Sequence, residues 1–178
     1  MKILKSFGAR DLIVIAALAA IGIAIKPVVG PIFKMISTPL GIPGGSFAGG
    51  FYMLWLVLAV LIVNKPYAGT LFGILQAIGV LIMGLAGNQG ALSLITYTVP
   101  GIVVDVLYML IGHRTRLFTH MVLCALANLA GTLLSAWLFF NHPPLFMALI
   151  GALALGSGLI GGVLSCGLYK TLQNMRII

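Results

Sequence analysis

Long apolar runs fill most of this sequence and determine what it can fold into. Six stretches of about 20 residues are almost free of charge, and a helix of that length crosses the hydrocarbon core of a bilayer. Hydrophobic residues make up 61% of the 178 residues and charged residues 7%, which is too few to cover a water-exposed surface. The sequence therefore predicts an all-α integral membrane protein.

Prolines, glycines and charged residues delimit the six predicted transmembrane helices. The longest interval, residues 30–46, holds Pro31, Pro39, Pro43 and the Gly44-Gly45 pair. Because proline lacks the backbone donor and glycine is entropically costly in a helix, we predict a long loop here. Six spans use up the chain, which predicts one membrane-embedded domain over residues 1–178. The predicted helices are 11–29, 47–63, 67–86, 92–112, 117–140 and 145–169.

The basic residues predict the orientation, because cytoplasmic loops carry the excess of Lys and Arg. Only Lys26 and Lys34 fall on one side of the six spans, and the other basic residues fall on the opposite side. Both termini are therefore predicted to be cytoplasmic. The net charge of +8 then reflects topology and not a nucleic-acid partner. The predicted cytoplasmic residues are Lys2, Lys5, Arg10, Lys65, Arg114, Arg116, Lys170 and Arg176.

Asp105 lies well inside the fourth predicted helix, among valines and a leucine. A carboxylate at that depth costs about 3 kcal/mol on insertion scales, so it is a functional hypothesis by default. The alternative is a protonated Asp105 that bonds Asn128 or Gln76 and serves only packing. The other acidic residue, Asp11, begins the first helix, where a carboxylate suits the positive end of the helix dipole.

Amide and aromatic side chains supply the remaining candidates for binding a small solute. Amides also join helices within a bilayer, and aromatic rings also gather at its interfaces, so each residue has a structural alternative. We expect a site in the outer half of the bundle, with Asp105 at its floor and the 30–46 loop as its lid. The candidate binding residues are Trp55, Gln76, Asn88, Gln89, Tyr97, Asp105 and Asn128, with Tyr52 as a further ring.

The sequence shows no set of residues typical of catalysis. It lacks a Walker-type loop, a paired carboxylate and a Ser/His/Asp or Cys/His arrangement, so neither ATP hydrolysis nor another enzymatic activity is predicted. His113, His120 and His142 share no metal-ligand spacing on one helix face. We therefore predict no resident metal and no cofactor.

Small residues form a stripe along the first predicted helix. Ala16, Ala20 and Ala24 repeat at every fourth position, which places them on one face and permits close approach of another helix. The last helix carries a similar set. Packing within the bundle is the structural alternative for both stripes. The second set is Ala154, Gly158 and Gly162.

With this stripe, the chain resembles the substrate-capture subunit, or S component, of energy-coupling-factor (ECF) vitamin importers. Such subunits are six-helix bundles with both ends inside, and an alanine stripe on the first helix docks the transmembrane coupling (T) subunit. Ala16, Ala20 and Ala24 match that stripe. The resemblance implies a T subunit and two ATPase subunits as partners, in the lipid of a prokaryotic plasma membrane.

A closer similarity is to the YkoE-like branch, the proposed thiamine and hydroxymethylpyrimidine importers. It is carried by three segments: Gly49 to Trp55, Asn64 to Gly69, and the glycine-rich turn Gly84 to Gly90. The fourth helix of that branch carries a glutamine-glycine pair before a carboxylate. Here Pro100-Gly101 precedes Asp105, so the chain departs from that branch with Pro100 for the amide and Asp for Glu.

The resemblance implies capture of a small vitamin-like solute, such as a thiamine precursor, at the extracellular face. One alternative is haem or another tetrapyrrole, for which His142 and the methionines would serve. A metal-ion cargo fits less well, since related cobalt and nickel subunits have a histidine after the initiating methionine and this chain has Lys2. An alternative of another class is a membrane scaffold or assembly subunit that binds no ligand.

Overall fold

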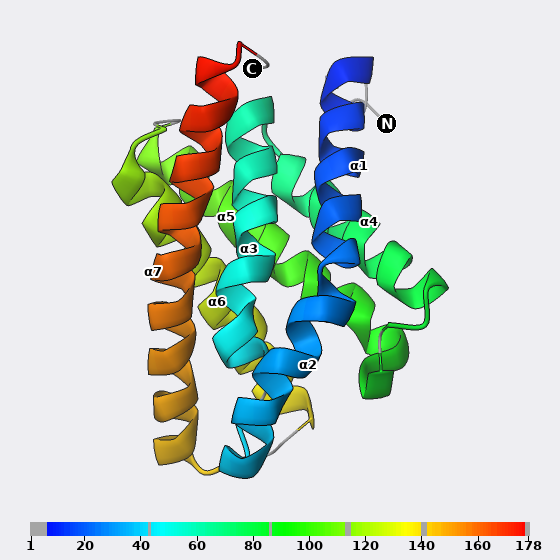
Figure 1. Ribbon diagram of the computed structural model, residues 1–178, viewed down its shortest axis with the longest axis vertical. Helices are drawn as coiled ribbons and strands as arrows, with labels where there is room; N and C mark the ends of the chain where they lie inside the picture. Colours follow the sequence, from blue (N-terminus) through cyan, green and yellow to red (C-terminus); the bar gives the residue numbers. More distant parts are fainter. Residues whose placement is uncertain (1–6, 43, 86, 113–114, 140–141, 177–178) are drawn as a thin grey trace.

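The computed structural model is helical throughout the part of the chain that it describes. That part comprises residues 7–42, 44–85, 87–112, 115–139 and 142–176, with residues 87–89 described by their backbone alone. The helices pack side by side, and α4 and α5 run obliquely across the others (Figure 1). The elements are α1 (Ala9–Ala24), α2 (Lys26–Ser37), η2 (Thr38–Leu40), α3 (Gly44–Val63), α4 (Ala68–Ile82), η3 (Gly87–Leu92), α5 (Ser93–Ile111), α6 (Leu117–Phe139) and α7 (Pro144–Asn174).

The all-α prediction is confirmed for the described residues, and five of the predicted transmembrane segments each overlap one helix, while 11–29 spans the bend between α1 and α2. Four of the observed helices are long and apolar enough to cross a bilayer. The α1–α2 pair counts as a fifth if the two form one bent span. The apolar helix α4 has 15 residues, which falls short of the length of a usual span. Crossing by all six segments therefore stays a prediction.

The loop predicted for residues 30–46 is wrong, because most of this interval is helical. Helix α2 runs from Lys26 to Ser37 and continues into η2, and Gly44-Gly45 opens α3. Pro31 sits inside α2, where it forfeits one backbone hydrogen bond without ending the helix. The chain instead bends by 44° between α1 and α2. Pro27 in the first turn of α2 accounts for the bend, since its ring crowds the preceding turn.

Helix α3 lies at the centre of the bundle and packs against α1, α2, α4, α6 and α7. Its glycines let two neighbouring backbones come close. A Cβ on Gly50 would overlap the backbone of Ser157, and a Cβ on Gly161 would overlap the backbone of Gly50. Ser157 adds two hydrogen bonds across this contact: its Oγ donates to the Phe47 carbonyl over 2.5 Å and accepts from the Gly50 N–H over 3.1 Å. Small residues and such bonds are what join helices in lipid.

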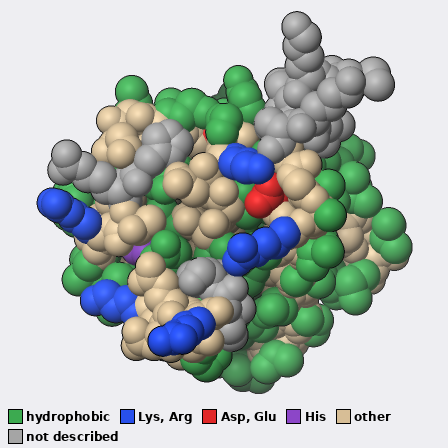
Figure 2. Space-filling view, turned by 90° about the horizontal axis from the view of Figure 1, so that it is seen from above, with side chains coloured by type: hydrophobic (Ala, Val, Ile, Leu, Met, Phe, Trp, Pro, Cys, Tyr) green, Lys and Arg blue, Asp and Glu red, His purple; other side chains and the backbone are tan. Residues whose placement is uncertain are grey.

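The start of α1 and the end of α7 lie at the same end of the bundle (Figure 1). Seen from that end, Lys and Arg side chains are spread over the surface, with one acidic side chain beside a basic one (Figure 2). Lys34, by contrast, lies near the end of α2, at the opposite end of the bundle. The described residues of this basic end are Arg10, Lys65, Arg116, Lys170 and Arg176.

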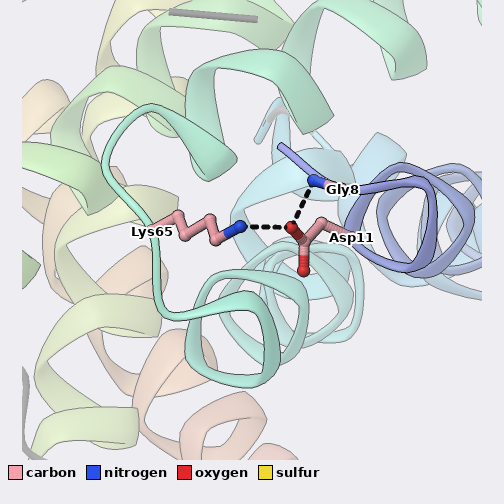
Figure 3. A network of polar contacts seen from close by, with 3 residues as sticks. All are labelled: Gly8, Asp11 and Lys65. Carbon is pink, nitrogen blue, oxygen red and sulfur yellow. Dashed lines mark hydrogen bonds and ion pairs between the residues drawn. The ribbon is translucent and has the colours of Figure 1, made fainter. Parts of the chain in front are cut away.

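Asp11 ties the start of α1 to the turn between α3 and α4 at this basic end. Its Oδ2 accepts a hydrogen bond from the Gly8 N–H over 2.8 Å and lies 2.6 Å from the Lys65 Nζ (Figure 3). The side chain of Lys65 is 36% exposed, so the ion pair contributes about 1 kcal/mol or less. Asp11 thus has a structural partner in addition to the helix dipole.

Helices α4 and α5 cross at a pair of glycines, and this crossing yields a stability prediction. A Cβ on Gly101 would overlap the backbone carbonyl of Gly69. We expect Gly101→Ala to lower the free energy of unfolding in detergent by about 1–3 kcal/mol, because the two backbones must separate. Gly156→Ala is the control, since a Cβ there meets no atom within 4 Å. Equal stability of the two variants would contradict the close crossing.

Candidate functional site

A lysine buried inside the bundle marks the candidate site. Lys26 begins α2 at the bend, and its Nζ is buried with no hydrogen-bond acceptor among the described residues. The Nζ lies 3.7 Å from the ring centroid of Tyr97 and 5.3 Å from that of Tyr52. Two aromatic faces, one from α3 and one from α5, therefore hold the end of this side chain.

The free-energy balance at Lys26 is unfavourable without a further partner. Removing an ammonium group from water costs several kcal/mol in a real protein, even after relaxation. A cation–π contact in a desolvated place returns about 2 kcal/mol. The Tyr97 and Tyr52 rings thus offset part of the cost and leave the N–H donors without acceptors. An uncompensated buried charge of this kind is typical of a functional position.

Two further buried donors lie beside Gly22, four residues before Lys26 in the sequence. Trp55 Nε1 and Gln76 Nε2 are both buried without a hydrogen-bond partner. Both side chains border Gly22, which lies near the end of α1, just before the bend that leads to Lys26. Trp55 in turn follows Tyr52 by three positions on α3, and residues three or four apart on a helix are neighbours at about 5–6 Å. We call Lys26, Tyr52, Trp55, Gln76 and Tyr97 the donor cluster.

Glycines let neighbouring helices approach closely around the donor cluster. Gly22 leaves room on α1 for the Gln76 amide and the Trp55 side chain. Gly73 on α4, three residues before Gln76, faces the Tyr97 carbonyl, and a Cβ there would lie 2.6 Å from that oxygen. These close approaches place an ammonium group, an indole N–H, an amide N–H and two phenol rings around one region. Such a set suits a small planar molecule that carries hydrogen-bond acceptors.

Asp105 lies outside the donor cluster and bonds different residues from those expected. Its Oδ1 accepts from the Gly69 N–H over 2.8 Å, and its Oδ2 accepts from the Thr70 N–H and Oγ1, each over 2.7 Å. Neither Asn128 nor Gln76 is its partner. The carboxylate thus satisfies donors at the start of α4, which no residue of that helix can satisfy. Eight residues separate Asp105 from Tyr97 on α5, or about 12 Å along the axis.

Asn128 holds α6 to α7. Its Nδ2 donates to the Ala154 carbonyl over 2.8 Å, and its Oδ1 accepts from Thr132 Oγ1 over 3.3 Å. Its amide also fills the space beside Gly49. The side chains of Asn88 and Gln89 lie outside the described residues. Of the predicted binding residues, the structure therefore brings together Trp55, Gln76 and Tyr97 and places Asp105 and Asn128 in helix-to-helix contacts.

The sequence reasoning missed Lys26. It counted this lysine as an outward-side charge, because a lysine near the end of a span usually extends to the membrane interface. Only the contacts with Tyr52 and Tyr97 show that it points into the bundle. Tyr52 was noted as a ring without an assigned partner, and the structure places it against Lys26.

The two stripes of small residues differ in their surroundings. Ala16, Ala20 and Ala24 are exposed on α1 and leave one face of that helix open. On α7, Gly158 and Gly162 pack against α6 so closely that a Cβ on either would overlap its backbone. The α7 stripe therefore serves packing within the bundle, as the structural alternative proposed. The α1 stripe has no such neighbour among the described residues.

An open apolar groove lies apart from the donor cluster, between α6 and α7. Its lining includes Leu129, Leu133, Trp137 and Met147, and it offers almost no polar surface. A groove of this composition suits lipid acyl chains better than a polar solute. We therefore place the candidate site at the donor cluster, where the unpartnered donors lie.

Several apolar helices around a buried polar site define a multi-pass membrane protein. Residues 10–132 match the family described as the permease component of an ABC-type cobalt transport system, so the chain belongs to that family. It is thus a membrane component of an ABC-type transporter, which works with partner ATPase and membrane subunits. Comparison with curated proteins and with solved structures gives no match. The described residues contain no group of three His, Cys, Asp or Glu side chains placed to hold a metal ion.

The contacts of Asp105 predict a structural role, which a conservative substitution at this position tests. Asp105→Asn replaces one accepting oxygen with a donor that faces the N–H groups of α4. We expect a loss of about 2–3 kcal/mol in the free energy of unfolding, measured by denaturation in detergent. Asp11→Asn, the same change at the more exposed ion pair, should cost about 1 kcal/mol or less. Unchanged stability of Asp105→Asn with weakened ligand binding would instead make Asp105 a ligand contact.

Proposed function

We propose that this chain is the S component of an ECF-type importer and captures a small vitamin-like organic solute at the donor cluster. The observation that carries the proposal is the set of buried donors of Lys26, Trp55 and Gln76, which have no acceptor among the described residues. Membership of an ABC-transporter family supports the transport role. The exposed stripe of Ala16, Ala20 and Ala24 supports docking to a T subunit.

In this proposal the chain binds and orients the solute, and two partner ATPase subunits supply the energy. The acceptors of the solute would pair with the three donors, while the Tyr52 and Tyr97 rings pack beside it. Entry from outside requires a movable cover over Lys26. Helix α2 suits this role because it begins at the bend and touches α3 through Phe33 and Phe51, with ring centroids 6.2 Å apart.

Six crossings with both termini in the cytoplasm complete the proposed topology. The shared end of α1 and α7 supports an even number of crossings, and the basic residues at that end support its cytoplasmic location (Figures 1 and 2). The short α4 lies between α1 and α5, against which it packs, so neighbouring protein supports its ends. The donor cluster then lies toward the outer half, because Tyr97 and Lys26 sit away from the basic end.

Cobalt is the competing cargo, since the description of the matched family names it. The donor cluster argues for an organic solute, because ammonium, indole and amide N–H groups bind acceptors and not cations. A tetrapyrrole and a scaffold role without ligand are the remaining alternatives. Mass spectrometry of the small molecule that copurifies with the protein distinguishes the four: it would detect an organic solute, cobalt, a tetrapyrrole or nothing.

Docking on the α1 stripe leads to a test of the S-component role. Ala20→Leu should abolish copurification of the T subunit and ATPases, because extra methylenes at a close helix contact cost about 1–3 kcal/mol. Ala152→Leu, the same change at an exposed alanine of α7, is the control. Ligand binding by the isolated chain should survive both changes. If the T subunit still copurified with the Ala20→Leu variant, this face of α1 would not be the docking surface.

The proposed topology predicts which positions react with an impermeant thiol reagent in intact cells. Thr38 and Thr115 are both exposed and lie at opposite ends of the bundle, so a cysteine at either position is accessible from one side. Cys124 and Cys166, both buried, would be replaced by alanine. We expect labelling of Thr38→Cys and protection of Thr115→Cys until the cells are permeabilised. Labelling of Thr115→Cys in intact cells would reverse or refute the orientation.

A further inference from the structure

We propose that the solute captured by this chain is a small planar anion, whose carboxylate or phosphate oxygens pair with Lys26. This inference rests on the proposed function and specifies the chemistry of the ligand at the same site. It excludes as cargo both a metal cation and a cationic ring such as a thiazolium. The argument proceeds from the charges of the whole chain to the contacts of Lys26.

The chain contains no carboxylate side chain left to neutralise Lys26. Its sequence holds two acidic residues, Asp11 and Asp105. Asp11 pairs with Lys65 at the basic end, and Asp105 accepts three hydrogen bonds at the start of α4. If Lys26 carries its charge, the ammonium requires a counter-charge, and both acidic residues already pair with other groups. In this inference a bound molecule supplies that negative charge.

The surroundings of Lys26 also favour an anion over a neutral acceptor. Every polar atom of the donor cluster known to lack a partner is a donor: the Lys26 ammonium, the Trp55 indole N–H and the Gln76 amide N–H. Carboxylate and phosphate oxygens accept several hydrogen bonds at once, and bonds to an ionised acceptor are about twice as strong as neutral ones. A cation at this place would meet the positive charge of Lys26 without an opposing carboxylate.

The rings fix the shape of the ligand. Tyr97 and Tyr52 lie on the Lys26 ammonium from α5 and α3, and Trp55 stands one turn further along α3. A flat ring can pack beside these aromatic rings and the Trp55 indole while its acidic group reaches Lys26. Trp55 and Gln76 border Gly22, four residues before Lys26, and a separation of this order suits a single-ring or fused two-ring acid.

The test uses yeast extract as the ligand source, separated on an anion-exchange resin into retained and flow-through fractions. Each fraction is added to the purified full chain in detergent, and the unfolding temperature is measured. We expect the retained fraction to raise it by about 5 °C or more, because a ligand that binds the native state alone stabilises it. Phosphatase treatment of the retained fraction then separates the two sources of the charge: loss of the effect indicates a phosphate, and persistence indicates a carboxylate.

Variants connect the effect to Lys26. Lys26→Met should abolish the shift, whereas Lys34→Met, the same change at an exposed lysine of the same helix, should retain it. Lys26→Gln keeps a donor of similar length but loses the charge, and it serves as the second variant if Lys26→Met does not give a monodisperse protein. We expect it to reduce the shift strongly as well.

The outcomes separate the two proposals. Stabilisation by the flow-through fraction alone, or an undiminished shift in the Lys26 variants, would overturn the anionic ligand while leaving solute capture intact. Stabilisation by neither fraction would overturn the proposed function, and the anionic ligand with it. Stabilisation by cobalt chloride in place of the retained fraction would support the cargo named in the family description and contradict this inference.

Discussion

Close backbone approach at glycines is the constraint on which the rest of this bundle depends. In lipid, burial of apolar side chains between helices gains little, because the acyl chains are equally apolar, so contact distance and a few polar bonds hold the helices together. Gly50 and Gly161 join α3 to α7, Gly158 and Gly162 join α7 to α6, and Gly69 and Gly101 join α4 to α5. Each contact leaves no room for a methyl group on its glycine.

Helix α3 links this packing to the candidate site through a single stretch of sequence. Gly49 and Gly50 face α6 and α7, where Asn128 and Ser157 fill the space beside them. In the same part of α3, Tyr52 contacts Lys26 and Trp55 borders Gly22. The segment Gly49 to Trp55, on which the family resemblance partly rested, thus serves both the packing of the bundle and the donor cluster.

The sequence predicted the helices well and the site only in part, for a physical reason in each case. Hydropathy locates a span because about 20 apolar residues suffice to define one. Hydropathy could not show that α2 is helical, because a proline inside a segment normally predicts the end of a helix. Only the structure shows that α2 continues past Pro31 despite the lost hydrogen bond. Nor could hydropathy pair residues across helices: the bonds of Asp105 to Gly69 and Thr70 depend on the crossing of α4 and α5.

Asp105 and Lys26 differ in how far the chain itself compensates an ionisable group buried among the helices. Both are ionisable residues in apolar segments, and the same cost of burial applies to both. The three hydrogen bonds of Asp105 come from the chain itself, so its charge is compensated in the ligand-free protein. Lys26 receives only aromatic faces, and its N–H donors stay without acceptors. A bundle held by close helix contacts can tolerate this local cost, and under the proposed function a solute whose acceptors pair with Lys26 would gain affinity by removing it.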